Sequence, residues 1–323
     1  MCQVYAAYDE ELDRRVAVKV LLPSRSDDHG SRLRLMREAL AQARLSHPNV
    51  VQIYEVGEHA GQIYVAMEYV RGRNVAEWLR VSKDGPRPWE EVLAVFVSAG
   101  RGLAAAHRSG LVHRDFKPAN VLIGDSGKVC VADFGLARLQ GDDTFEVETD
   151  GDREPAPRLT PETLTATGAI VGTPAYMAPE LFEGQRGDEA SDQYAFCVAL
   201  YEALYGQWPH LSETPTAFVL AKIRGDVRPP PAGTRVPAWL HAAILRGLSV
   251  KPQDRWLSMT DLLAEIGRDR RAVRRRWAQL AAAVVLSAAT LIAGVSAWRA
   301  ASESRAKEEA ARAERARAQR AAE

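Results

Sequence analysis

The stretch that decides the fold is LVHRDFKPANVLIGDSGKVCVADFG, residues 111–135. It contains two acidic motifs, His113-Arg114-Asp115 and Asp133-Phe134-Gly135. Between them, the apolar runs 121–123 and 129–131 flank a turn that begins and ends with glycine, a pattern that predicts a β-hairpin. A hairpin of this size holds the residues at its two ends side by side. We therefore expect the polar side chains at these ends to share one small volume.

Three polar side chains should meet in this volume: Asp115, Asn120 and Asp133. One carboxylate can accept the proton of an attacking hydroxyl group. An amide and a second carboxylate can hold the metal ions that neutralise a triphosphate. The set therefore has the chemistry that phosphoryl transfer needs.

The stretch resembles the catalytic loop and the metal-binding loop of protein kinases, H-R-D-L-x-x-x-N followed by D-F-G, with Phe116 in place of the usual Leu. Lys117 resembles the serine/threonine form of the loop. The resemblance implies that the cofactors are ATP and Mg²⁺, with Mn²⁺ as an alternative ion. Asp115 would be the catalytic base, and Lys117 would stabilise the γ-phosphate. Asn120 and Asp133 would hold the metal.

The composition narrows the class of protein. The chain has 323 residues and a formal net charge of zero, so no overall polarity argues for nucleic acid as a partner. The three cysteines, Cys2, Cys130 and Cys197, form no C-x-x-C and lie at no metal-ligand spacing. This pattern argues against a disulfide framework or a zinc site and fits a reducing compartment.

The order of strands and helices agrees with the resemblance. Apolar alternation predicts strands at 3–8, 15–22, 50–57 and 62–70, and helical spacing predicts helices at 32–45, 89–109, 191–206, 239–248 and 259–267. The resemblance implies an α+β, two-lobed kinase fold, with a small β-rich N-lobe at about 1–70 and a helical C-lobe at about 71–267.

The resemblance also implies an ATP site in the N-lobe. Lys19, in Val16-Ala17-Val18-Lys19, is similar to the lysine that contacts the α- and β-phosphates, and Glu38 would orient it. Residues 67–70 occupy the positions of the gatekeeper and hinge, although periodicity alone fits an ordinary central strand equally well. The implied ATP-binding residues are Val4, Ala17, Lys19, Glu38, Met67, Glu68, Tyr69, Val70 and Asp133.

The start of the chain departs from the family pattern. Val4 and Tyr5 align with the exit of the glycine-rich loop that covers the phosphates, and Cys2 falls on its last glycine position. The first strand and the other two glycines would lie before Met1. We therefore expect a start placed too late, at an internal methionine, or a fragment.

The segment after the second motif resembles an activation segment that ends in Gly172-Thr173-Pro174 and Ala178-Pro179-Glu180. Thr163, Thr165 and Thr167 lie where members of the family are commonly phosphorylated. A phosphate there could pair with Arg114 and order the segment. The alternative is a solvated loop rich in threonine.

Several further residues have structural roles by resemblance. Asp192 would hold the backbone of the catalytic loop, and Arg255 would pair with Glu180. Arg114 and Thr173 belong to the same structural set. These residues would shape the site without taking part in the chemistry.

A possible membrane segment lies near the end of the chain. Residues 277–298 include no charged residue, and as a helix these 22 residues would span about 33 Å, against a hydrocarbon core of about 30 Å. Tryptophans at both ends match interfacial anchoring. This predicts one transmembrane helix; a buried alanine-rich helix is the alternative.

The charges around this segment predict its orientation. The basic juxtamembrane segment 268–276 favours the cytoplasmic face and anionic lipid, although the polar, helical tail 299–323 is also rich in arginine. A domain that uses ATP must face the cytosol. We expect a single-pass protein of the cell membrane with a cytoplasmic kinase domain at 1–267. A homodimer formed through the membrane helix remains open.

Together these observations predict a membrane-anchored serine/threonine protein kinase that resembles the bacterial receptor-like, eukaryotic-type family. It would phosphorylate Ser or Thr hydroxyls of proteins, including its own activation segment. The alternative is a catalytically impaired fragment or pseudokinase that acts as a signalling scaffold. A small-molecule kinase is disfavoured by 172–174 and 178–180, which resemble the platform for a protein substrate.

Overall fold

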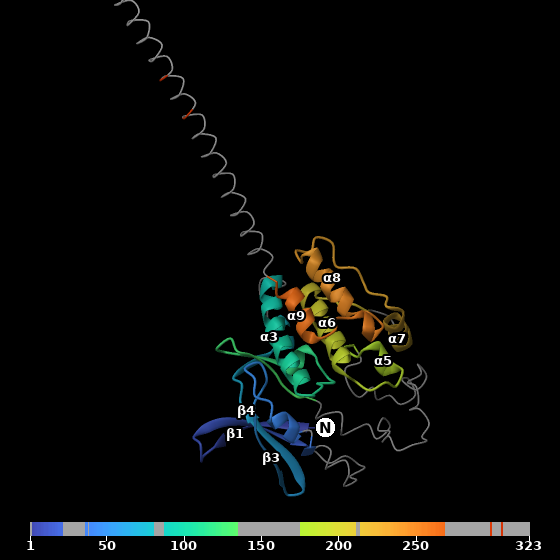
Figure 1. Cartoon of the computed structure of the whole chain (residues 1–323). Helices are drawn as coiled ribbons and strands as arrows, with labels where there is room; N and C mark the ends of the chain where they lie inside the picture. The colour runs from blue at the N-terminus through green and yellow to red at the C-terminus, as the bar shows by residue number, and fades with distance from the viewer. Residues whose placement is uncertain are drawn as a thin grey trace, which may run out of the picture. The chain divides into compact units, whose positions relative to one another are not determined.

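The computed structural model describes residues 2–21, 36–37, 39–80, 87–134, 175–210 and 214–268, together with the single residues 298 and 305. The chain divides into two units, Met1–Gly267 and Arg268–Glu323. The elements given below all belong to the first unit. Figure 1 shows them in chain order.

The N-terminal part is a four-stranded antiparallel sheet in the order β1-β2-β4-β3. Its strands are β1 (Cys2–Asp9), β2 (Arg14–Leu21), β3 (Ile53–His59) and β4 (Gln62–Glu68). In β4, buried residues alternate with half-buried ones, as expected for a strand with one face on a core. The four predicted strands are confirmed, with ends that differ by up to three residues.

A second, smaller sheet carries the decisive stretch. It has the order β5-β6-β7, with β5 (Gly72–Asn74), β6 (Val121–Gly124) and β7 (Val129–Val131). The N–H of Gly127 donates to the carbonyl of Gly124 (2.8 Å), and Gly127 has φ 81°, a left-handed value that glycine adopts without strain. The predicted hairpin is therefore confirmed.

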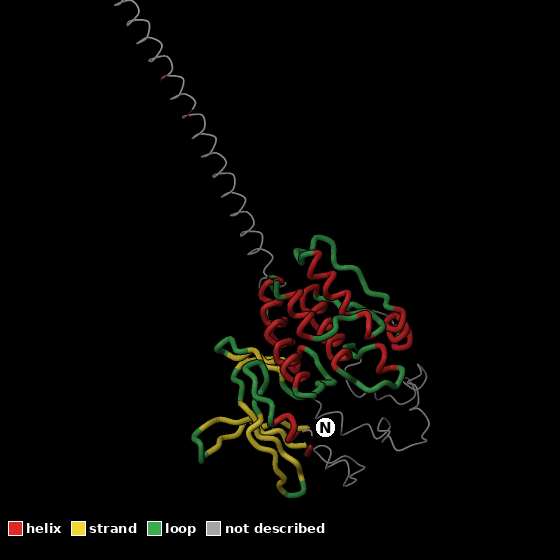
Figure 2. Tube along the Cα trace, viewed as in Figure 1, coloured by secondary structure: helices red, strands yellow, loops and turns green. Residues whose placement is uncertain are grey.

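The C-terminal part is helical, and Figure 2 shows its helices beside the strands of the two sheets. Its helices are α2 (Val75–Arg80), α3 (Trp89–Arg108), α5 (Pro179–Phe182), α6 (Glu189–Tyr205), α7 (Pro215–Arg224), α8 (Ala238–Gly247) and α9 (Met259–Ile266). Two 3₁₀ turns, η1 (Pro118–Asn120) and η3 (Pro252–Asp254), complete the described elements. The predicted helices at 89–109, 191–206, 239–248 and 259–267 are confirmed.

Helices α3 and α6 form the centre of the larger core. Eleven residues of α6, from Ser191 to Tyr201, are buried without interruption, which marks a helix enclosed on all sides. The ring of Phe196 packs edge-on against that of Phe96 in α3, with centroids 5.6 Å apart. Burial of large side chains of this kind is the main favourable term in folding.

Strand β7 joins the two cores. Val129 and Val131 belong to the large helical core, whereas Cys130 and Ala132 belong to the smaller core under the N-terminal sheet. Side chains of a strand alternate between its two faces, so one short strand can bind both parts. Asp133, which follows, is thereby placed where the two cores meet.

The chain that enters the N-terminal sheet is also fixed to the helical part. The N–H of Val51 donates to the carbonyl of Val131 (2.9 Å), and the N–H of Val131 donates to that of Asn49 (2.9 Å). Gly102 of α3 lies directly beneath, where an added Cβ would approach the carbonyl oxygen of Asn49 to 2.3 Å. Only glycine permits this close approach of helix and chain.

The predicted helix at 32–45 is partly described, with helical residues at 36–37 and 39–43. Glu38, the predicted partner of Lys19, lies outside the described residues. So do Gly135, the threonines at 163, 165, 167 and 173, and the segment 277–298 apart from Trp298. Among the described residues, no helix is long and apolar enough to span a bilayer.

Candidate active site

Lys19 and Asp133 form an ion pair between the two parts of the domain. The Lys19 side chain in β2 is only 1% exposed, and its Nζ lies 2.7 Å from Oδ1 of Asp133. Asp133 follows β7 and is 35% exposed. A lysine is seldom buried unless its ammonium is paired. The pair joins residues 114 positions apart and brings the predicted phosphate-binding lysine to the predicted metal ligand.

The register of the sheet places other predicted ATP-binding residues beside Lys19. Val4 lies opposite Lys19 in the β1–β2 pair, and Ala17 lies opposite Met67 in the β2–β4 pair. Residues directly opposite each other share one face of a sheet, and so do residues two apart in a strand. Val4, Ala17, Lys19 and Met67 therefore share one face.

The predicted hinge follows β4. The N–H of Glu68 donates to the carbonyl of Gln52 (2.8 Å), which leaves contact with adenine to other backbone groups of 68–70. The Glu68 carboxylate pairs with Nζ of Lys128, a residue of the hairpin. Tyr69 and Val70 are half-buried. The contact with Lys128 joins the predicted hinge to the hairpin formed by β6 and β7.

Asp115, Lys117 and Asn120 form one hydrogen-bonded group. Nζ of Lys117 lies 2.7 Å from Oδ2 of Asp115. The side-chain amide of Asn120 donates to the main-chain carbonyl of Asp115 (2.8 Å) and to its Oδ2 (3.3 Å). Asp115 and Lys117 keep 29% and 23% of their side chains exposed, so a substrate can reach them.

Main-chain contacts connect this group to Asp133. The N–H of Ala132, the residue before Asp133, donates to the carbonyl of Asn120 (2.8 Å). The ring Nε2 of His113 lies 3.0 Å from the carbonyl of Ala132. The structure therefore brings the ends of the hairpin together, as the sequence predicted.

His113 is a buried, neutral support for this arrangement. Its side chain is fully buried, and burial lowers the pKa of its imidazole. Because a carbonyl only accepts, Nε2 donates to Ala132, and Nδ1 then accepts from the N–H of Asp115 (3.3 Å). The ring also packs against Phe116 and Phe134, with centroids 5.8 and 4.7 Å away. Phe116, the departure from the family pattern, thus fills the core beside His113.

Asp192 holds the backbone of the predicted catalytic loop through hydrogen bonds. Its carboxylate is 1% exposed in the first turn of α6. Oδ2 accepts from the N–H of His113 (2.7 Å) and contacts Nε2 of His107 (2.9 Å), while Oδ1 accepts from the N–H of Arg114 (2.8 Å). The predicted role of Asp192 in holding the loop backbone agrees with this geometry.

Two site residues have left-handed backbone conformations. Arg114 has φ 63° and Asp133 has φ 60°. Such values are uncommon for residues other than glycine and persist where surrounding contacts hold them. Asp192 supplies that contact to the N–H of Arg114, and Lys19 supplies it to the Asp133 side chain.

Glu180 and Arg255 form a second, fully enclosed ion pair. Both oxygens of Glu180 accept from the guanidinium, at 2.7 Å each. The other donors of Arg255 reach the carbonyls of Ser249, Ala190 and Val250. The predicted pairing is present, and it ties α5 to the chain before α9.

The residues that precede α5 make two contacts that the sequence did not predict. The hydroxyl of Tyr176 donates to Oε2 of Glu202 (2.7 Å), and its ring packs against Trp208. Burial raises the pKa of Glu202. Nζ of Lys222 donates to the carbonyls of Ala175 and Met177. These partners come from distant helices, so no local pattern pointed to them.

The side chains around Asp133 suit a magnesium ion bound with a nucleotide. Asp133 is partly exposed and has one oxygen engaged by Lys19, and Asn120 contributes an amide. Carboxylate and amide oxygens are ligands that Mg²⁺ accepts, usually with waters and substrate phosphates. In the described part of the chain, no cluster of three or more His, Cys, Asp or Glu residues could hold a metal alone. The donor set therefore fits an ion that arrives with phosphates.

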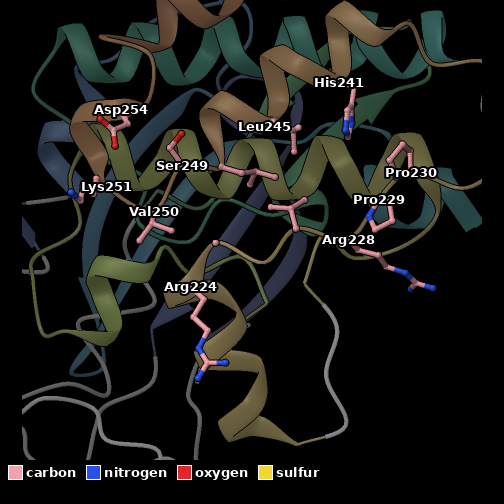
Figure 3. A pocket seen from close by; sticks show the side chains of 13 residues that line it. Arg224, Arg228, Pro229, Pro230, His241, Leu245, Ser249, Val250, Lys251 and Asp254 are labelled. Carbon is pink, nitrogen blue, oxygen red and sulfur yellow. The ribbon is translucent and has the colours of Figure 1, made fainter.

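A pocket of about 650 Å³ lies elsewhere in the helical part (Figure 3). It is lined by the end of α7, the chain that follows it, α8 and residues 249–254. The side chains of Arg224 and Arg228 point in different directions at its edge. None of the residues predicted to bind ATP or metal lines this pocket. It is therefore separate from the site described above.

Comparison with known families identifies the fold. The family described as protein kinase domain matches residues 1–265. The chain belongs to the protein kinase domain family. This membership confirms the two-lobed kinase fold and the prediction of a protein kinase domain.

Two curated relatives of this kinase domain are bacterial proteins. The serine/threonine-protein kinase PknB of Mycobacterium leprae is 34% identical over 271 residues, which cover 82% of this chain and 40% of the relative. The probable serine/threonine-protein kinase CA_C1728 of Clostridium acetobutylicum is 31% identical over 264 residues, 81% of this chain and 37% of the relative. The chain thus spans about two fifths of the length of these relatives.

A solved structure gives the same result for the fold. The crystal structure of the PknI kinase domain of Mycobacterium tuberculosis aligns with a TM-score of 0.60 at 27% identity, covering 83% of this chain and 90% of that one. The similarity extends over both the sheet and the helices, because it covers most of the kinase domain. The catalytic residues can therefore be interpreted within the kinase framework.

Proposed function

We propose that this kinase domain transfers the γ-phosphate of ATP to Ser or Thr hydroxyls of proteins. The observation that carries the proposal is one continuous set of contacts. Lys19 bonds Asp133, and Ala132 beside it bonds the main chain of Asn120. The Asn120 side chain in turn bonds Asp115. The predicted phosphate-binding lysine, metal ligands and catalytic base are thereby held around one volume.

Each residue then has a distinct role. Asp115 orients the substrate hydroxyl and accepts its proton, and Lys117 places a positive charge beside Asp115 for the transferred phosphate. Lys19 positions the phosphates, while Asn120 and Asp133 would hold the Mg²⁺ that neutralises their charge. Catalysis of this kind depends on positioning and on electrostatic stabilisation, with little covalent chemistry by the protein.

The proposal extends to the activation segment. Thr163, Thr165 and Thr167 are the expected sites of autophosphorylation, and Arg114, which is exposed beside Asp115, is the expected partner of the phosphate. Mass spectrometry of the active protein should find phosphate on at least one of these threonines. Active protein with none of the three modified would contradict this part of the proposal.

We also propose that residues 277–298 anchor the protein in the cell membrane, with the kinase domain on the cytoplasmic side. The support is the uncharged length of the segment, its terminal tryptophans and the arginines before it. Protein substrates, the lipid bilayer and a homodimer are the proposed partners. Full-length chain that leaves the membrane fraction in high-pH carbonate buffer would contradict the anchor.

The central experiment measures phosphate transfer from γ-labelled Mg-ATP by the full chain beside its Asp115→Asn variant. Asn keeps the size of Asp but cannot accept the proton, so transfer should fall by about 10²–10⁴-fold. Circular dichroism of both proteins checks that the fold is intact. Equal transfer by the two proteins would refute the role of Asp115. A wild-type chain that binds ATP without transfer would favour the scaffold alternative.

A further inference from the structure

Lys222 occupies an unusual position for a lysine. It belongs to α7, its side chain is 0% exposed, and it lies one helical turn after the buried Val219. Removing an ammonium from water is unfavourable unless other groups replace the lost hydration. The contacts of Lys222 therefore indicate what its burial achieves.

The ammonium is held by backbone oxygens. Nζ donates to the carbonyls of Ala175 and Met177, at 2.7 Å each. The rings of Phe218, Tyr194 and Phe182 surround it, with centroids 5.1, 5.4 and 5.9 Å away. Aromatic faces attract a cation and exclude water. Lys222 therefore binds two carbonyls inside an aromatic enclosure.

The two carbonyl groups take no part in the backbone hydrogen bonds that the structure describes. In the part of the chain that the structure describes, neither carbonyl accepts a backbone N–H. The segment enters α5 directly, where Glu180 is fixed by Arg255. Residues 175–180 are thus held by Lys222 and the hydrogen bond from Tyr176 to Glu202 at one end, and by Arg255 at the other.

We propose that Lys222 is a positioning residue for the protein substrate: by holding the carbonyls of Ala175 and Met177, it sets the path of the backbone against which the substrate peptide lies. The inference rests on the proposed function, because 172–174 and 178–180 resemble the platform for a protein substrate. Lys222 does not touch the reacting groups. Its effect is on which peptides bind and how well.

The test compares Lys222→Met with wild-type full-length chain. Methionine fills a similar volume among the aromatic rings but donates no hydrogen bond. Arg224→Met is the matched control, because it removes an exposed cation from the same helix. The substrates are synthetic Ser/Thr peptides with randomised flanking residues, used with Mg-ATP.

We expect Lys222→Met to raise the KM for the peptide mixture by about tenfold and to flatten the preference for residues next to the phosphorylated Ser or Thr. The KM for ATP should stay within about twofold, because Lys19 and Asp133 are unaffected. A purely structural role would instead lower all rates in proportion to the unfolded fraction. Unchanged peptide KM and unchanged preference would overturn the proposal.

Amide hydrogen exchange tests the positioning independently of activity. Peptides that cover 175–180 should exchange faster in Lys222→Met than in wild type, and at the wild-type rate in Arg224→Met. Equal exchange in all three proteins would overturn the proposal. If wild-type chain shows no transfer that depends on Asp115, the proposed function fails, and exchange alone then decides whether Lys222 positions the segment.

Discussion

Two ion pairs of the same length differ in how far their acidic side chains are exposed. Lys19–Asp133 and Arg255–Glu180 both have a closest contact of 2.7 Å. Glu180 is only 5% exposed, whereas Asp133 is 35% exposed. Arg255 uses its remaining donors on three backbone carbonyls. The Arg255–Glu180 pair, which we call the closed pair, is enclosed on every side. The Lys19–Asp133 pair, which we call the open pair, presents a carboxylate to the solvent.

The difference separates structural pairs from chemical ones. Burial and complete hydrogen bonding leave Arg255–Glu180 no alternative partner, so it can only hold chain segments together. Asp133 keeps an accessible carboxylate on a left-handed backbone, and its carboxylate forms an ion pair with Lys19. An oxygen donor in that position can accept a metal ion. The exposure of the acid distinguishes the two pairs better than their distance does.

The largest effect is expected on breaking the closed pair. Arg255→Met would leave the Glu180 carboxylate buried without its partner and would remove the hydrogen bonds from Arg255 to three backbone carbonyls. Such losses typically cost about 3–5 kcal/mol of stability. Urea unfolding monitored by circular dichroism measures the change.

A double variant separates the causes of this loss. Glu180→Gln removes the unpaired charge, so the Glu180→Gln/Arg255→Met protein should recover part of the lost stability. Asp125→Asn is a suitable control, because its pair with Arg71 is 65% and 80% exposed and should contribute little. A loss below about 1 kcal/mol for Arg255→Met would show that the closed pair is not a structural lock.

Breaking the open pair should affect function more than stability. Lys19→Met leaves Asp133 accessible to water, so the free energy of unfolding should change by about 1 kcal/mol or less. Transfer from Mg-ATP should fall by about 100-fold or more, because the phosphates lose a positioned cation. Single-turnover rates and urea unfolding on the same preparation give both numbers. A loss of stability as large as that of Arg255→Met would erase the distinction between the pairs.

The sequence predicted the reactive half of this comparison because the evidence is local. Asp115, Asn120 and Asp133 lie within 19 residues and are joined by one short hairpin, so the strand pattern alone brings them together. The pairing of Glu180 with Arg255 spans 75 residues and followed only from the family resemblance. Local pattern and family resemblance thus predicted different parts of the site.

The contacts that were missed depend on packing between distant elements. Glu68 meets Lys128 across 60 residues, and Lys222 meets Ala175 across 47. One signal for Lys222 was available: it lies three residues after Val219, on the apolar face of α7. A charged residue on such a face predicts a buried partner but not its identity. The predicted contact of Lys19 with Glu38 stays a prediction, because Glu38 lies outside the described residues; the described partner of Lys19 is Asp133.

A polar cluster of His210, Tyr194 and Asp226 lies beside the closed pair and should make the stability of the domain depend on pH. His210 is 2% exposed, and its Nδ1 donates to the carbonyl of Asp226 (2.9 Å) while its Nε2 accepts from the hydroxyl of Tyr194 (2.8 Å). The ring of Tyr194 lies 5.0 Å from the Arg255 guanidinium. Burial, aided by the charge of Lys222, lowers the pKa of His210 from 6.5 to about 4.

The sign of the effect follows from which state binds the proton first. Well above pH 6.5, His210 is neutral in the folded and the unfolded chain. As the pH falls below 6.5, the unfolded chain takes up the proton first, so stability decreases until about pH 4, where the folded chain is protonated too. Between pH 7.5 and 5.5 this histidine alone should lower the free energy of unfolding by about 1.3 kcal/mol.

His210→Gln keeps a polar side chain but does not titrate, so the free energy of unfolding of this variant should fall by that much less over the same range. Buried His113 shifts in the same direction, so both proteins should still lose some stability in acid. Parallel curves of unfolding free energy against pH for the two proteins would contradict the prediction. They would mean that His210 is protonated as readily in the folded chain as in the unfolded one.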